Sequence, residues 1–150
     1  PTYASHPAAS LLSRHAGDER RHGRMFAELA GTTVAEHEGS EAFALETRYH
    51  EAYARWVGDD LFALVCLLHG FELRSGVLQC HWFALMDMFP DSEAAAIRPA
   101  FTRISTDEVF HITYTAQLVA EGLARGGSSE RLATALRLAE MDLATLERMV

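Results

Sequence analysis

Apolar residues recur along the chain at the three- and four-residue spacing of helices, and no segment alternates apolar and polar residues as a strand does. The spacing predicts a first helix over residues 7–30, which Gly31 and the two threonines after it should end. One face of this helix mixes apolar, carboxylate and imidazole side chains: Leu11, Leu12, His15, Glu19, His22, Phe26 and Leu29.

Turn-forming residues divide the rest of the chain into further predicted helices. Residues 31–57 are ambiguous, with a loop near residue 38 and a short helix that Ser40 could cap. In the longest predicted helix, Pro99 predicts a kink or a break. The remaining helices are expected over about residues 60–89, 92–125 and 130–150. The predicted fold class is all-α, a bundle of four to five helices that forms one domain over residues 1–150.

Composition and charge exclude several classes of function. The formal net charge of −8 argues against a nucleic-acid partner and against an anionic membrane surface, because both need a basic face. All thirteen basic residues are arginine, so a Schiff-base lysine and a P-loop lysine are excluded. The sequence also has no Gly-rich phosphate loop and no G-x-S-x-G motif.

The two cysteines and the apolar runs bear on the compartment. Cys66 and Cys80 fall on one predicted helix, roughly 21 Å apart at the helical rise, which is too far for a disulfide. The longest uninterrupted apolar run, residues 61–68, is shorter than a membrane span. No signal peptide is visible, and we expect a cytoplasmic protein without a membrane partner. Because the chain begins with Pro1, we expect its start to be trimmed or truncated.

Two short segments, residues 18–22 and residues 107–111, share the pattern Asp-Glu-x-x-His. Positions i and i+3 of a helix lie on one face, so the Glu and the His of each segment project together. A carboxylate with an imidazole is a good partial site for iron or manganese. The candidate ligands from the two segments are Glu19, His22, Glu108 and His111.

Glu72 lies between these segments on the apolar predicted helix. A carboxylate in such surroundings is costly unless it is paired or bound to a metal. Glu-x-x-His, then Glu, then Glu-x-x-His is the ligand order of the last three helices of a ferritin-like four-helix bundle.

Over residues 8–125 the chain therefore resembles the ferritin-like di-metal carboxylate superfamily, which includes oxygenases, ribonucleotide reductase small subunits, rubrerythrins and ferritins. The resemblance implies a ferritin-like bundle in which Glu19 and Glu108 bridge two metal ions. It implies that His22, His111 and Glu72 are terminal ligands. The segment 18–22 also resembles the Asp-Glu-x-Arg-His signature of the hydroxylase branch. That likeness implies that Asp18 and Asp107 hydrogen-bond the histidine ligands.

The chain departs from the family pattern at two points. The family supplies another Glu from a helix before the first Glu-x-x-His, and here the only acidic residue before Glu19 is Asp18. Either that helix is missing or another carboxylate replaces it, and Glu46 and Glu51 are the candidates within the chain. His15 precedes Glu19 by four residues, which resembles the extra-histidine motif of di-iron arylamine N-oxygenases. His15 is then a third histidine ligand, or it only faces the end of the bundle.

Simpler interpretations compete with the metal site. The paired Glu and His residues could be solvated helix charge, and Glu72 could be an exposed residue paired with Arg74. His69 is expected to be a satisfied core histidine rather than a ligand. Gly76 either leaves room for dioxygen or substrate, or makes a helix-packing contact. The aromatic residues expected in the core rather than in a substrate pocket are Phe62, Phe83, Phe110 and Tyr114.

The favoured function is a non-haem di-metal oxidase or oxygenase that uses two iron ions, or iron plus manganese. Dioxygen is the expected co-substrate. The expected partners are a small organic substrate and an unidentified electron donor. The sequence leaves open whether the chain also forms a homodimer. No catalytic residue beyond the metal ligands is predicted. The alternatives are a ferroxidase that handles iron and a structural bundle without chemistry.

Overall fold

The computed structural model describes residues 6–31 and 50–147, with side chains described as far as residue 140. Within these ranges the regular structure is helical and contains no strand, so the predicted all-α class is confirmed. The chain divides into two compact units, of which the first ends at Asp60 and the second begins at Leu61. The expected single domain remains a prediction.

The first unit contains α1, Ala9–Ala30, which matches the first predicted helix closely. Gly31 ends it in the left-handed conformation (φ 65°), with its backbone N–H directed at the carbonyls of Ala27 and Glu28. Residues 50–57 are helical and end at Gly58, again at positive φ (55°). The predicted cap at Ser40 lies outside the described residues.

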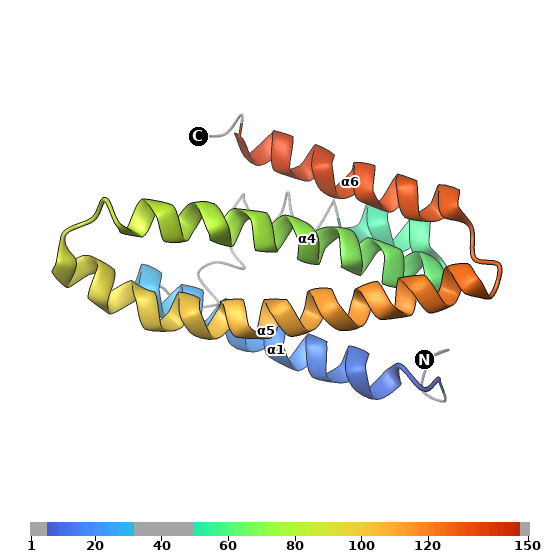
Figure 1. Cartoon of the computed structure of the whole chain (residues 1–150), viewed down its shortest axis with the longest axis horizontal. Coiled ribbons are helices and arrows are strands. Elements are labelled where there is room, and N and C mark those ends of the chain that lie inside the picture. Colours follow the sequence, from blue (N-terminus) through green and yellow to red (C-terminus); the bar gives the residue numbers. More distant parts are fainter. Residues whose placement is uncertain (1–5, 32–49, 148–150) are drawn as a thin grey trace. The chain divides into compact units, whose positions relative to one another are not determined.

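The second unit consists of α4 (Leu61–Met86), α5 (Asp91–Ala124) and α6 (Ser129–Glu147). α4 lies between α5 and α6 and packs against both, and short turns connect the three helices in sequence (Figure 1). α4 and α6 therefore run in the same direction, antiparallel to α5. This arrangement makes α4 the central helix of the second unit, and its apolar sequence suits contacts on two sides.

Small residues allow the close packing of α4. A side chain at Gly70 would lie 3.1 Å from the carbonyl oxygen of Ala135 and 3.2 Å from the Cβ of Ala139 on α6. At the beginning of α4, the ring of Phe62 occupies the space that a Cβ at Gly122 on α5 would need. Glycine and alanine at these contacts thus set the distances between the helix axes.

α5 continues without a break through Pro99, so of the two predicted alternatives the break is wrong. Proline removes one backbone hydrogen bond and disfavours a helix interior. Aromatic packing lies close by, since the ring of Phe101 is 6.1 Å from that of Trp82 and 6.5 Å from that of Phe83. This packing between α4 and α5 offsets the local penalty, as tertiary contacts commonly do.

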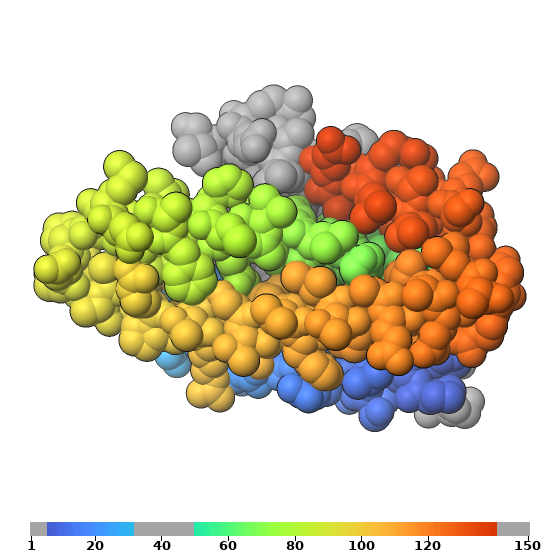
Figure 2. Space-filling view, viewed as in Figure 1, coloured from blue at the N-terminus to red at the C-terminus, as the bar shows by residue number. Residues whose placement is uncertain are grey.

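The hydropathy and the two cysteines of α4 are relevant to the expected cellular location. Within the described residues it is the one helix long and apolar enough to cross a membrane by length and composition, with a mean hydropathy of 1.6. A core helix of a soluble protein meets the same criterion, so the expectations of a cytoplasmic location and of no membrane partner remain predictions. Both cysteines are free thiols on this helix, Cys66 buried and Cys80 exposed, as expected. The surface of the chain is drawn in Figure 2.

Candidate metal centre

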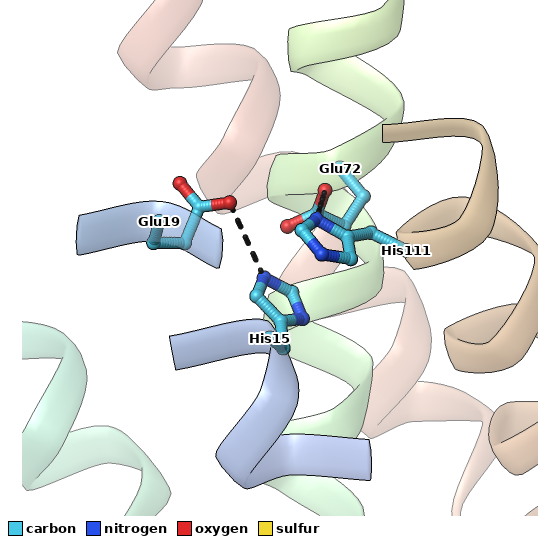
Figure 3. A group of neighbouring side chains, drawn as sticks. All are labelled: His15, Glu19, Glu72 and His111. Atoms are coloured by element: carbon cyan, nitrogen blue, oxygen red, sulfur yellow. Dashed lines mark ion pairs between the residues drawn. The ribbon is translucent and has the colours of Figure 1, made fainter. Parts of the chain in front are cut away.

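In the first unit, three side chains of metal-ligating type gather on one face of α1. These residues, which we call the α1 cluster, are His15, Glu19 and His22. One carboxylate oxygen of Glu19, Oε1, lies 3.4 Å from Nδ1 of His22 and 3.8 Å from Nε2 of His15. Figure 3 shows the ring of His15 turned towards this carboxylate. Both histidines are buried, whereas the side chain of Glu19 is about half exposed.

The α1 cluster has a neighbouring buried carboxylate in Asp18. Its oxygens lie 2.8 Å from the guanidinium of Arg21 and 3.6 Å from that of Arg14, one turn away on either side. The arginines thus compensate the charge of Asp18 locally. The predicted hydrogen bond that a histidine ligand donates to Asp18 stays a prediction, as does the same role for the partly buried Asp107.

In the second unit, Glu72 on α4 lies beside His111 on α5, and Glu108 lies one turn before His111 on α5. We call Glu72, Glu108 and His111 the α4–α5 cluster. Oε2 of Glu72 on α4 lies 3.4 Å from Nδ1 of His111 on α5, and Figure 3 shows the two side chains directed at one another. Glu108 precedes His111 by three residues on α5, so the two share a helix face. All three residues are buried, and His111 is fully enclosed.

The carboxylate–imidazole distances are compatible both with ion pairs and with ligands of one cation. An N–H···O hydrogen bond usually spans about 2.7–3.2 Å, shorter than both 3.4 Å contacts. Two atoms each about 2.1 Å from a cation lie about 3.0 Å apart at 90° and about 4.2 Å apart at 180°. The separations of 3.4 and 3.8 Å within the clusters fall in this interval.

The donor set also restricts the kind of metal. Both clusters offer carboxylate oxygens and imidazole nitrogens and contain no cysteine. Such ligands suit iron, manganese or zinc rather than copper(I) or an iron–sulfur cluster. Burial of Glu72 and Glu108 favours a bound cation further, because a carboxylate loses its hydration there.

Burial decides between the metal interpretation and some of the simpler ones. Solvated helix charge does not describe His22, Glu108 or His111, which are buried. Glu72 is buried too, so the alternative of an exposed Glu72 is wrong. The guanidinium of Arg74 lies over the ring of Phe71, 5.1 Å from its centre. Among the candidate ligands, Glu19 alone has the exposed side chain expected of a surface residue.

His69 and Thr115 form a link that the sequence interpretation did not assign. Nδ1 of His69 on α4 lies 3.0 Å from the hydroxyl oxygen of Thr115 on α5, consistent with the expected satisfied core histidine. Burial lowers the pKa of His69, and the negative charge of Glu72 raises it in part. The sequence carried one signal for this contact. Thr115 is a hydroxyl residue on the same predicted helix stripe as Glu108, four residues after His111.

Gly76 is a packing position. A Cβ there would lie 3.0 Å from Cδ1 of Ile112, so the side chain of Ile112 already fills the space considered for dioxygen or substrate. Two aromatic rings flank His111 instead, Phe110 at 6.1 Å and Tyr114 at 6.3 Å between ring centres. These rings surround the imidazole with apolar carbon.

The source of a further carboxylate is not found among the described residues. Of the two candidates within the chain, Glu51 is exposed on the helical segment 50–57 and Glu46 lies outside the described residues. Both alternatives for this ligand, a helix missing from the chain and a replacement by another carboxylate, remain predictions.

Comparison of the chain with protein-family models, with curated proteins and with solved structures gives no match. The resemblance to the ferritin-like superfamily consequently rests on the motifs in the sequence alone. The candidate ligands rest on those motifs and on the geometry within each unit.

Proposed function

We propose that the chain binds two iron ions, or one iron and one manganese ion, through the residues of the α1 cluster and the α4–α5 cluster. The observation that carries this proposal is the 3.4 Å separation of Glu72 and His111 inside the second unit. A buried carboxylate beside a buried imidazole, joined across two helices, has the spacing and chemistry of a chelating pair. The order of the ligands along the sequence supports the assignment of two ions rather than one.

We further propose that the chain is an oxidase or oxygenase acting on a small organic molecule. Iron in a carboxylate–histidine site supplies the activation of dioxygen when it is bound. The role of the protein is to position the ligands and to keep water away from them. Cys66, Ile104 and Tyr114 are buried residues of α4 and α5 that contribute to a dry interior.

The residues of the α4–α5 cluster have distinct tasks in this proposal. Glu72 and His111 present one oxygen and one nitrogen from different helices, so they fix the distance between α4 and α5 when a cation is bound. Glu108 contributes a second carboxylate from α5 and balances the charge of the cation. Phe110 and Tyr114 limit the orientations open to the imidazole of His111.

The experiment measures metal content after anaerobic reconstitution with iron(II), with and without manganese(II). The variants are Glu108→Gln, which keeps the shape of the side chain, and Glu121→Gln as a control on the exposed surface of α5. We expect about two metal ions per chain in the wild type and the control, and a clear loss in Glu108→Gln. Absence of metal from all three proteins would contradict the proposal and favour the structural bundle.

Oxygen uptake then separates the enzyme from an iron-handling protein. An oxidase or oxygenase consumes dioxygen in proportion to an organic substrate, supplied as a panel of small aromatic and aliphatic compounds together with a reductant. A ferroxidase consumes dioxygen in proportion to added iron(II). Metal loading with uptake that follows iron(II) alone would overturn the oxygenase assignment.

A further inference from the structure

Thr115 makes a cross-helix contact that sets it apart from the other threonines on α5, besides contacts to two carbonyls of its own helix, of which that of Ile112 is the more distant at 3.2 Å. Its hydroxyl oxygen lies 2.7 Å from the carbonyl oxygen of His111 and 3.0 Å from Nδ1 of His69 on α4. Thr102 and Thr113 also bond the carbonyl four residues earlier, at 2.9 and 2.6 Å, but in exposed positions. Thr115 is fully buried and connects two helices.

The distances indicate which atom carries each proton. A hydroxyl has one proton to donate, and the carbonyl of His111 can only accept. The 2.7 Å contact has the usual length of an O–H···O bond, and the 3.0 Å contact that of an N–H···O bond. Thr115 therefore donates to the carbonyl of His111 and accepts from Nδ1–H of His69. This assignment leaves Nε2 of His69 without the proton in the neutral ring.

The link lies one helical turn from the proposed metal ligands. His69 precedes Glu72 by three residues on α4, and Thr115 follows His111 by four residues on α5. At the rise of a helix, the two cross-helix contacts are roughly 5 Å apart along the axes. Two contacts at different heights fix both the sliding and the rotation of one helix against the other.

We propose that Thr115 and His69 are positioning residues that hold Glu72 and His111 at the spacing needed to bind one metal ion. This inference rests on the proposed metal site. The hydroxyl of Thr115 bonds the backbone of His111 itself, so loss of the hydroxyl acts directly on the helix turn that carries this ligand. Outer partners of this kind commonly alter metal affinity by about 10–100-fold.

The first test uses the metal-free protein. Long-range proton–nitrogen NMR of the imidazole rings reports which nitrogen of His69 carries the proton. We expect the Nδ1–H form in the wild type and in Thr115→Ser, and a shift of the equilibrium towards Nε2–H in Thr115→Val. The Nε2–H form in the wild type would overturn the assignment, whether or not the protein binds metal.

The second test titrates cobalt(II) into the same proteins and records its visible absorption, which reports the number and arrangement of ligands. We expect Thr115→Val to bind about 10–100-fold more weakly with an altered spectrum, and Thr115→Ser to stay close to the wild type. Thr113→Val removes an exposed hydroxyl from the same helix and should change neither property. Thermal melts of all variants show whether each one folds.

The outcomes separate the two proposals. Wild-type affinity and spectrum in Thr115→Val would overturn the positioning role while leaving the metal site intact. A wild type that binds no cobalt(II) and no iron(II) would overturn the proposed function and the positioning role together. In that case the NMR result would still establish the hydrogen bond as a link between α4 and α5.

Discussion

Nδ1 of His111 and Oε2 of Glu72 lie 3.4 Å apart, the same separation as Nδ1 of His22 and Oε1 of Glu19. In the first unit the pair lies three residues apart on one helix, whereas in the second unit it joins α4 to α5. In both pairs the imidazole atom nearest the carboxylate is Nδ1. Two different backbone arrangements thus present the same pair of donor atoms, which argues for a shared chemical purpose.

A first prediction follows from the burial of Glu72. Glu72 is buried beside His111 and is a proposed ligand, so Glu72→Gln should lose most of the stabilisation that iron(II) gives to the wild type. Metal at 100 times its dissociation constant stabilises the wild type by about 2.7 kcal/mol. Urea unfolding with a chelator and with iron(II) measures this gain in both proteins.

The exposed Glu121→Gln serves as the control for this experiment. Its side chain pairs with Arg125 at the surface, so the change should alter stability by less than about 0.5 kcal/mol in either condition. A Glu72→Gln protein that gains as much stability from iron(II) as the wild type would contradict the assignment of Glu72 as a ligand.

Local features of the site could be predicted from the sequence because they follow from helix geometry. The spacing of Glu19 and His22 places them on one face once the segment is helical, and α1 is helical. The burial of Glu72 followed from its apolar neighbours. The bond between His69 and Thr115 could not be predicted, because it depends on the register of α4 against α5.

The helix around Pro99 could not be predicted from local sequence, because it depends on tertiary contacts. Local propensity predicts a kink or a break there, yet packing around Phe101 keeps α5 continuous. Gly76 shows the same dependence on context, because the side chain that fills the space beside it comes from Ile112 on the other helix. The sequence alone does not show which side chains lie opposite a small residue.

A second prediction compares two glycines within helices. Gly70→Ala should lower the free energy of unfolding by about 1 kcal/mol, because the added methyl group meets the backbone oxygen of Ala135 at 3.1 Å. Gly23→Ala in α1 should raise it by about 1 kcal/mol, since nothing lies within 4 Å and alanine favours the helix. Chemical denaturation of the metal-free proteins measures both. A Gly70→Ala protein that is as stable as the wild type, or more stable, would contradict the close packing of α4 and α6.

A third prediction concerns pH. Burial lowers the pKa of His69 in the folded chain, so below its ordinary value of 6.5 the unfolded state binds more protons at this residue. The stability contributed by neutral His69 should be complete above about pH 6.5 and should be lost as the pH falls towards the lowered value. The advantage of the wild type over His69→Gln should therefore be smaller at pH 5.5 than at pH 7.5.

Urea unfolding in the presence of a chelator tests this sign without interference from metal. The other histidines are present in both proteins, so the difference between them isolates His69. An advantage that stays constant or grows towards pH 5.5 would mean that the charge of Glu72 outweighs burial at this position.

The last prediction addresses His15, for which the sequence left two roles open. Its Nε2 lies 3.8 Å from the same oxygen of Glu19 that faces His22, within the interval for two ligands of one cation. If His15 is a ligand, His15→Ala should weaken cobalt(II) binding by about tenfold or more, and His22→Ala should weaken it as well. His81→Ala removes an exposed histidine of α4 and should leave binding unchanged. Wild-type affinity in His15→Ala, with weaker binding in His22→Ala, would assign His15 to the end of the bundle and leave Glu19 and His22 as the ligand pair of α1.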